Sequence, residues 1–260
     1  MEYVNVIGSV TGPRSFLVRG QQVTGGFAPR GITYNLQVEH RLAKLLHLRA
    51  SYSDNRSVGL ITLEPDLLGT TNEIVLNGDG SSRYRQLEVT TKFSWKDAQQ
   101  MVVSYTRSRS EGNLNGFDTY LGNFPTPKLH PVVYTNLPAD LPNRFLAWGH
   151  VKVPFWKLEM NPIIEYRNGF PYTRFDALQN YVGTPNSDST RFPKFFSADS
   201  RLSRDFQVTP KYAVKLSVTG FNLTNHFNAL AVHANTADPQ SGIFFGNYHR
   251  RYRFDFDILF

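Results

Sequence analysis

Residues that could do chemistry are few and scattered along the chain. No two of the seven histidines have the HxxxH or HExxH spacing of a helical zinc site. The chain has no cysteine, which excludes a thiol nucleophile, a disulfide framework and a cysteine-ligated metal. We therefore expect no metal site and no cofactor. The histidines are His40, His47, His130, His150, His226, His233 and His249.

One short segment resembles the start of a calcium-binding loop. It reads Asn77-Gly78-Asp79-Gly80-Ser81. A calcium loop needs a bidentate glutamate at its twelfth position. That position is Glu88, which falls inside an expected strand. The sequence therefore favours a plain external turn over a calcium site.

The composition is that of a mildly hydrophilic, basic protein with many aromatic residues. The formal net charge is +7, the mean hydropathy is −0.36, and aromatic residues make up 14% of the chain. The basic residues are spread along the whole sequence, which argues against a nucleic-acid partner. No run of 18 or more apolar residues is present, so we expect no transmembrane helix.

The dominant hydrophobic period is two, which indicates β-strands with one apolar and one polar face. The clearest case is the C-terminus, where apolar Tyr252, Phe254, Phe256, Ile258 and Phe260 alternate mostly with charged residues. The same alternation predicts strands over 32–39, 46–53, 87–93, 101–106, 158–167 and 212–219, with less regular ones over 143–153 and 195–206 and a weaker one somewhere in 3–19.

Short and long connections alternate between these strands. Short turns are expected near 41–45, 94–99, 154–156 and 207–211, and long polar stretches at 58–82, 110–141, 168–194 and 224–247. Ten-residue strands tilted by about 40° span about 25 Å of membrane. The pattern predicts an all-β antiparallel transmembrane β-barrel, or an open barrel segment of 9–10 strands, with short periplasmic turns and long extracellular loops. A soluble β-sandwich also alternates apolar and polar residues and remains the alternative.

The barrel geometry assigns roles to charged and aromatic side chains. Polar faces would line the lumen, and the candidate lining residues are Arg49, Glu88, Lys215, Arg251 and Asp255. Aromatic residues beside the short turns, such as Phe93 and Trp95, would form an interfacial girdle.

The neighbouring carboxylates Asp255 and Asp257 invite comparison with the omptin proteases of the outer membrane. Those enzymes need their acidic groups at the extracellular rim, whereas these two aspartates lie near the periplasmic end of the last strand. Arg251 and Arg253 can neutralise them there, so we interpret them as a lumenal charge network. No GxSxG sequence supports a serine hydrolase. We expect no catalytic residue and no enzyme activity.

The C-terminal forty residues resemble the end of a TonB-dependent outer-membrane receptor, and the hairpin from Tyr34 to Asp54 resembles barrel hairpins of the Oar-like receptors. The resemblance rests on Gly220-Phe221-Asn222-Leu223-Thr224-Asn225, on Phe245-Gly246, and on a final strand that ends in Phe260. Upstream, Asn168-Gly169-Phe170-Pro171-Tyr172 resembles the family's GxPY element. The alternating residues Tyr252, Phe254, Phe256, Ile258 and Phe260 resemble the signal read by the barrel-assembly machinery.

The family implies an N-terminal plug domain, a TonB box and about 22 strands. We find neither of the first two in the sequence, and 260 residues leave room for about ten strands. We therefore expect residues 1–260 to be a single barrel segment from a longer receptor, with a first strand and loop of unassigned boundaries in 1–29 and a Met1 that is not the true start. The energy-coupling TonB protein would act only through the missing N-terminal part.

The resemblance implies a receptor in the bacterial outer membrane that takes up a scarce ligand, such as a siderophore, an oligosaccharide or a peptide. Its partners would be outer-membrane lipid and the barrel-assembly machinery. The alternatives are a passive outer-membrane pore or adhesin-like barrel, an outer-membrane hydrolase, and a soluble carbohydrate-binding β-sandwich.

Overall fold

The computed structural model describes residues 3–6, 14–20, 28–65, 73–96, 99–115, 129–154 and 156–260. This part of the chain contains only strands, turns and irregular segments. The strands are β1 (Tyr3–Val6), β2 (Arg14–Gly20), β3 (Arg30–Ala43), β4 (Leu46–Pro65), β5 (Glu73–Ser94), β6 (Gln100–Gly112), β7 (Thr135–Asn136), β8 (Asn143–Val153), β9 (Leu158–Arg167), β10 (Phe195–Gln207), β11 (Ala213–Phe221), β12 (Ala229–Val232), β13 (Phe244–Asn247) and β14 (Arg251–Leu259).

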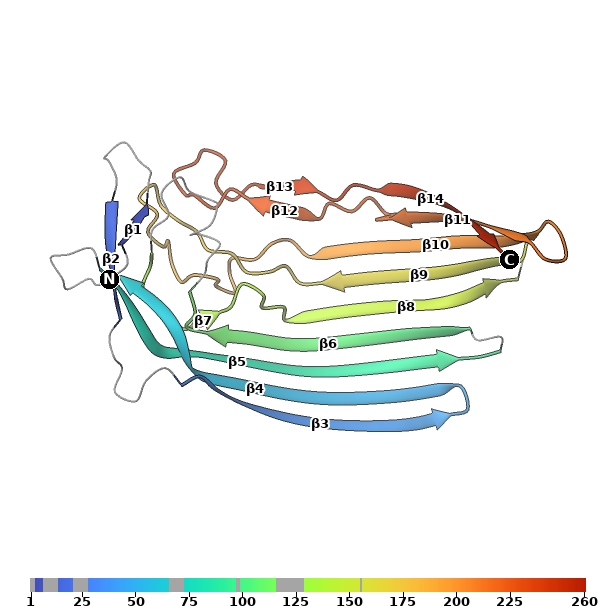
Figure 1. The fold of residues 1–260 in the computed structure, drawn as a ribbon, viewed down its shortest axis with the longest axis horizontal. Helices are drawn as coiled ribbons and strands as arrows, with labels where there is room; N and C mark the ends of the chain where they lie inside the picture. Colours follow the sequence, from blue (N-terminus) through green and yellow to red (C-terminus); the bar gives the residue numbers. More distant parts are fainter. Residues whose placement is uncertain are drawn as a thin grey trace.

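Nine strands lie side by side in one curved sheet, in the order β3-β4-β5-β6-β8-β9-β10-β11-β14 (Figure 1). All neighbours in this series are antiparallel. Within the described residues, β3 pairs only with β4 and β14 only with β11, so the sheet has two free edges. The prediction of an all-β antiparallel barrel segment is confirmed, and the segment is open.

Connections of different length lie at opposite ends of the sheet. The short turns that join β3 to β4, β5 to β6, β8 to β9 and β10 to β11 all lie at the end where the chain terminates (Figure 1). We call this the short-turn end and the opposite one the loop end. The loop end carries the connections between β4 and β5, β6 and β8, β9 and β10, and β11 and β14. The predicted alternation of short and long connections is confirmed for three of the four long connections, those that follow β6, β9 and β11.

The prediction of a long polar loop over 58–82 is wrong in its extent, because β4 and β5 continue through most of it. Their pairing reaches Pro65 and Ile74, with register shifts near Val58 and Leu60. The segment Asn77–Ser81, expected to be an external turn, therefore lies within β5. Its glycines and asparagine favour turns, but a long partner strand outweighs that local preference.

The N-terminal region forms two short strands instead of the one expected in 3–19. β1 and β2 pair with each other, and β2 pairs in parallel with the start of β5 at the loop end. With four and seven residues, neither strand is long enough to cross a membrane.

Pro162 interrupts one ladder of the sheet. Pairing between β8 and β9 stops after Trp148 opposite Ile163 and resumes at Val151 opposite Met160. Proline has no backbone N–H to donate to a neighbour, which accounts for the gap. On its other side, Pro162 remains paired with Ser200 of β10.

The described residues contain little apolar core. Ala147 and Phe175 are their only buried hydrophobic side chains, whereas many large apolar side chains are exposed. No helix among these residues is long and apolar enough to cross a membrane. Exposed apolar surface of this extent marks an interaction site.

Candidate functional site

Strand register sorts the side chains onto a polar and an apolar face. Across β4 and β5, Arg49 lies opposite Thr90, and the next pair, Ala50 and Val89, faces the other side. Directly opposed residues share a face, and successive residues alternate. The polar face therefore carries Arg49 and the apolar face Ala50, and the same rule extends across the sheet.

The apolar face is exposed along its whole width. Leu36 is 66% exposed and Phe254, eight strands away, is 80% exposed. Between them the same face presents exposed aliphatic and aromatic side chains, including Ile32, Val38, Leu87, Tyr105, Phe145, Ile164, Leu216 and Phe256.

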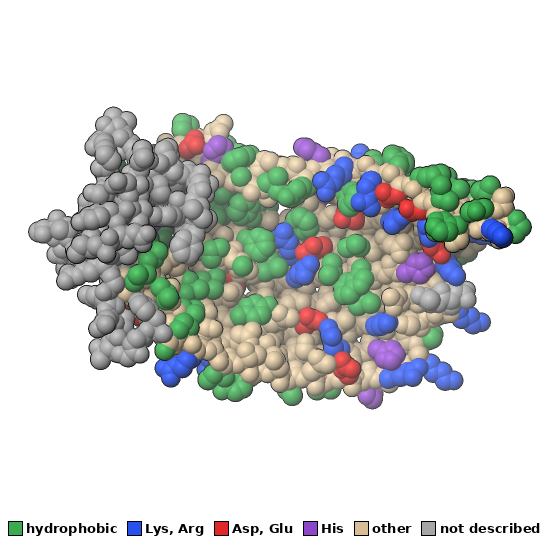
Figure 2. All heavy atoms as spheres, viewed as in Figure 1, with side chains coloured by type: hydrophobic (Ala, Val, Ile, Leu, Met, Phe, Trp, Pro, Cys, Tyr) green, Lys and Arg blue, Asp and Glu red, His purple; other side chains and the backbone are tan. Residues whose placement is uncertain are grey.

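All five predicted lumen residues lie on the polar face, but they do not form one site. The Arg49 guanidinium donates to Glu88 at 2.8 Å. Lys215 Nζ lies 3.7 Å from Glu159 and 3.5 Å from Asp205. Figure 2 shows acidic and basic side chains lying next to one another on the face in view. Four of the five predicted residues are thus spread over separate ion pairs from β4 to β14.

The carboxylates of β14 are held by different arginines. Asp255 lies 3.2 Å from Arg253, and Asp257 lies 3.7 Å from Arg201 of β10. The fifth predicted residue, Arg251, stacks over Phe221 at 5.0 Å. The two aspartates therefore take part in separate pairs, as a charge network requires. Among the described residues, no cluster of three or more histidines or carboxylates could hold a metal ion.

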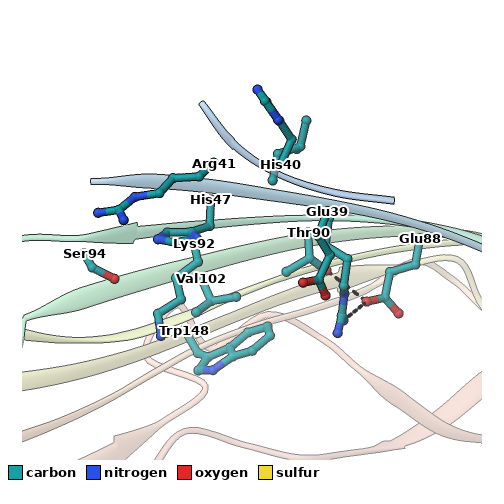
Figure 3. Close-up of a pocket in the computed structure, with 12 residues that line it drawn as sticks. Glu39, His40, Arg41, His47, Glu88, Thr90, Lys92, Ser94, Val102 and Trp148 are labelled. Atoms are coloured by element: carbon teal, nitrogen blue, oxygen red, sulfur yellow. Dashed lines mark hydrogen bonds and ion pairs between the residues drawn. The ribbon is translucent and has the colours of Figure 1, made fainter. Parts of the chain in front are cut away.

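The polar face of β3 to β8 encloses a cavity of about 600 Å³. Glu39, Glu88 and Thr90 point into the same space, and the Trp148 ring lies beside Val102 (Figure 3). A cavity lined from β3 to β8 makes the polar face the concave one. The wall offers carboxylates, hydroxyls and an indole, the mixture of groups that binds a partly polar ligand.

A second cavity of about 600 Å³ lies among the long loops. The β6–β8 connection contributes Pro138, the β9–β10 connection Tyr172 and Phe192, and the β11–β14 connection His233 and Phe245. This cavity is not predicted by the sequence. The signal was present as aromatic residues gathered in three loops, but only the tertiary structure brings these loops together.

Aromatic contacts hold this loop cavity together. The rings of Tyr172, Phe192 and Phe244 meet in edge-on and tilted contacts, with centroids 5.4 to 5.9 Å apart. Within the same loops, His233 Nδ1 lies 3.0 Å from Asp238. A backbone hydrogen bond from Gln240, together with His233, lowers the pKa of the Asp238 carboxyl. The cavity thus combines aromatic faces with an ionised carboxylate.

A buried ion pair anchors the loops to the sheet. The guanidinium of Arg191 donates to Asp140, which is 1% exposed, and to Asp188 at 2.6 Å. Asp140 in turn accepts a hydrogen bond from the backbone N–H of Ser110 on β6 at 2.6 Å. The hydrogen bond from Arg191 is the main cause of a lowered pKa at Asp188.

The segment Gly220–Asn225 closes the end of β11. Asn222 and Asn225 adopt positive φ angles of 46° and 54°, which asparagine tolerates better than most residues. The side chain of Asn222 donates to the carbonyls of His226 and Tyr248, and its backbone N–H donates to Asp199. The motif is therefore a turn that fixes the return of the chain toward β14.

The segment Asn168–Tyr172 positions an aromatic wall of the loop cavity. A Cβ on Gly169 would lie 1.8 Å from the carbonyl oxygen of Phe192, so only glycine fits this close backbone approach. Two residues on, the Tyr172 backbone N–H donates to the carbonyl of Thr190, which places its ring in the cavity.

No protein-family model and no curated protein matches the chain. Solved structures do match it in fold. They include the outer membrane transporter YddB from Escherichia coli, at 12% identity and a TM-score of 0.60 over 93% of this chain and 34% of that one. The FrpB iron transporter from Neisseria meningitidis (F3-3 variant) matches at 12% identity and a TM-score of 0.58, over 92% and 32%.

The ferric-catecholate import receptor Fiu from Escherichia coli K12 also matches, at 16% identity and a TM-score of 0.53 over 89% of this chain and 27% of that one. The chain thus spans about a third of the length of these proteins. At such low identities the likeness shows the fold, and it confirms the expected resemblance to outer-membrane transporter barrels at that level.

Proposed function

We propose that the chain forms the C-terminal part of a TonB-dependent receptor barrel in the bacterial outer membrane. One observation carries the proposal. A nine-stranded sheet has an exposed apolar convex face, an ion-paired concave face, and all its long connections at one end around a cavity. Lipid would cover the convex face, the concave face would line the lumen, and the loops would gather the ligand.

The two free edges support a place within a larger barrel. Unpaired edge groups are unfavourable in hydrocarbon, where no water can hydrogen-bond to them. Further strands of the receptor would pair with β3 and β14 and close the barrel. The plug domain and the coupling to TonB would belong to that missing part, and residues 1–260 would act as one barrel segment.

The last strand would carry the assembly signal. Tyr252, Phe254, Phe256, Ile258 and Phe260 are all more than half exposed, on a strand with one free edge. An accessible edge with regularly spaced aromatic side chains suits recognition by strand addition. The barrel-assembly machinery is the expected reader of these five residues.

A ferric siderophore is the first ligand to test, because two proteins of similar fold, Fiu and FrpB, are a ferric-catecholate import receptor and an iron transporter. The lumenal residues Arg49, Glu88, Lys215, Arg251 and Asp255 would line its path. Trp148 in the concave cavity offers a built-in probe. We expect saturable quenching of its fluorescence by a ferric catecholate, measured on the full chain in detergent with Trp95 and Trp156 replaced by phenylalanine.

Two variants locate the binding. Tyr172→Ala removes an aromatic wall of the loop cavity and should weaken binding about tenfold, the effect expected for one well-packed aromatic contact. Leu178→Ala, at an exposed loop position, is the matched control and should leave binding unchanged. Recovery of the chain in water without detergent would overturn the membrane assignment. Folded, detergent-bound protein that shows no saturable quenching would overturn the ferric ligand alone.

A further inference from the structure

A row of arginines crosses the convex face near the loop end. We call it the arginine belt, and it contains six residues of β3 to β6. Register places Arg56 opposite Arg83, and Arg85 opposite Arg109, on the same face as the exposed apolar side chains. This face was expected to be apolar, so the belt is unexplained by a lumenal or ligand-gathering role. Its members are Arg30, Arg56, Arg83, Arg85, Arg107 and Arg109.

The belt lies at the height of a membrane surface. Arg56 is ten residues along β4 from its start at Leu46. Ten residues rise about 33 Å, and a tilt of about 40° reduces that to about 25 Å, the thickness of the apolar band of an outer-membrane barrel. The belt would therefore meet the headgroups of the leaflet at the loop end.

Tyrosines mark the same boundary independently. Tyr34, Tyr52 and Tyr105 are exposed on the convex face, one or two residue pairs before the belt begins. Beyond them toward the short-turn end come aliphatic side chains such as Val38 and Val89. The order aliphatic, tyrosine, arginine is the order of side chains that cross from hydrocarbon into the interface.

Carboxylates hold part of the belt in a fixed array. Arg56 and Arg83 both donate through Nε and a terminal nitrogen to Asp54, at 2.7 to 3.3 Å. Glu111 lies 2.8 Å from Nε of Arg109, and it accepts a hydrogen bond from a terminal nitrogen of Arg85 at 3.3 Å. A guanidinium has five N–H donors, so each arginine retains donors after this pairing.

The belt keeps a positive surplus. Its six guanidinium groups face two carboxylates, Asp54 and Glu111, with Asp188 as a more distant neighbour 4.0 Å from Arg109. Within the described residues, Arg30 and Arg107 have no acidic partner within 4.0 Å, and both are exposed. No lysine shares the belt. Arginine suits bidentate contacts with phosphate, whereas lysine acts as a point charge.

We infer that the arginine belt binds the phosphate groups of a phosphorylated lipid in the leaflet at the loop end. Charge complementarity and the interfacial height select this ligand. Preorganised donors on Arg56, Arg83, Arg85 and Arg109 would bind one phosphate group, and Arg30 and Arg107 would flank it. The inference rests on the proposed membrane location and adds a lipid site on the outside of the sheet.

The test removes charge without breaking the ion pairs. The double variant Arg30→Gln/Arg107→Gln is compared with Lys92→Gln/Lys152→Gln, which removes the same charge from the concave face. Native mass spectrometry of the full chain in detergent measures retention of diphosphorylated lipid A and of its dephosphorylated form. Circular dichroism establishes that all variants keep the β-sheet.

We expect the native chain to retain the diphosphorylated lipid at least tenfold more strongly than the dephosphorylated one. The belt variant should lose about tenfold or more in affinity, since a charged hydrogen bond is worth roughly one such factor, and the concave control should match the native chain. Equal retention of the two lipids, equal loss in both variants, or displacement by millimolar inorganic phosphate would each overturn the inference. Membrane insertion that persists in such a case would leave the proposed function intact.

Discussion

The two faces of the sheet place their charges in different ways. On the concave face, oppositely charged side chains form separate pairs spread over the strands, such as Arg49 with Glu88 and Arg144 with Glu165. On the convex face, charges gather at the loop end, where buried Asp54 serves two arginines. The network continues from Arg109 through Asp188 into the loops.

In the proposed barrel, the difference follows from what each face would meet. A water-filled lumen screens charges, so exposed pairs can lie anywhere on its wall and contribute little stability each. Hydrocarbon excludes charge, so the convex face can carry arginines only at the level where lipid headgroups begin. Buried carboxylates in this network need their arginines, because an unpaired buried charge is costly.

The largest expected difference in stability is between replacing the arginine of a buried ion pair and replacing the arginine of an exposed one. Arg191→Gln leaves the carboxylate of Asp140 without its charged partner and should destabilise the loop end by about 3 kcal/mol or more. Arg49→Gln on the concave face should cost under about 1 kcal/mol of stability, because the ion pair between Arg49 and Glu88 is exposed. Thermal denaturation followed by circular dichroism, with hydrogen exchange at the Ser110 amide, measures both. Equal losses would remove the distinction between the two kinds of pair.

Neighbouring isoleucines of β9 test the assignment of the faces. Ile164 lies on the convex face opposite Ala147 and Ala198, and Ile163 lies on the concave face opposite Trp148. Ile164→Arg places a charge in the apolar band and should cost about 2–4 kcal/mol. Ile163→Arg, at the same depth, should cost under about 1 kcal/mol because the lumen is wet. Denaturant titration in lipid vesicles compares them, and a larger cost at Ile163 would reverse the faces.

Acidification should destabilise the loop end, by less than the Arg191→Gln and Ile164→Arg substitutions do. Because Arg191 lowers the pKa of Asp188, ionised Asp188 stabilises the folded state above the ordinary aspartate pKa of about 4. That contribution is lost as the pH falls through the lowered pKa. We expect the melting temperature to drop below about pH 4, and Asp188→Asn to flatten this part of the pH profile. An unchanged profile in the variant would assign the acid sensitivity to other groups.

The sequence predicts the barrel-like strands well because their signal is local. Apolar and polar residues alternate in 32–39 and in 252–260. Because successive side chains of a strand point to opposite sides, this alternation alone gives each strand an apolar and a polar face. The prediction from the sequence fails at 58–82, where glycines and Asn77 favour a turn but β4 and β5 pair with each other. It also fails in 3–19, where parallel pairing of β2 with β5 joins segments far apart in the chain.

The motif residues show the same limit. Asn222 and Gly169 could be noted as parts of a family pattern, but their roles depend on partners distant in the sequence. Asn222 holds the carbonyl of Tyr248, and Gly169 lies against the backbone of Phe192. The loop cavity was missed for the same reason, since Tyr172 and Phe244 meet only after three connections fold over the loop end.

The sequence by itself determined the class of fold, the two-faced strands and the alternation of short and long connections. Each depends on residue spacing within one strand or one turn. Only the tertiary structure decided that the sheet stays open, that four of the five predicted lumenal residues join separate ion pairs, and that six arginines align on the convex face. These features depend on strand register, which brings distant residues such as Arg30 and Arg109 to neighbouring heights on one surface.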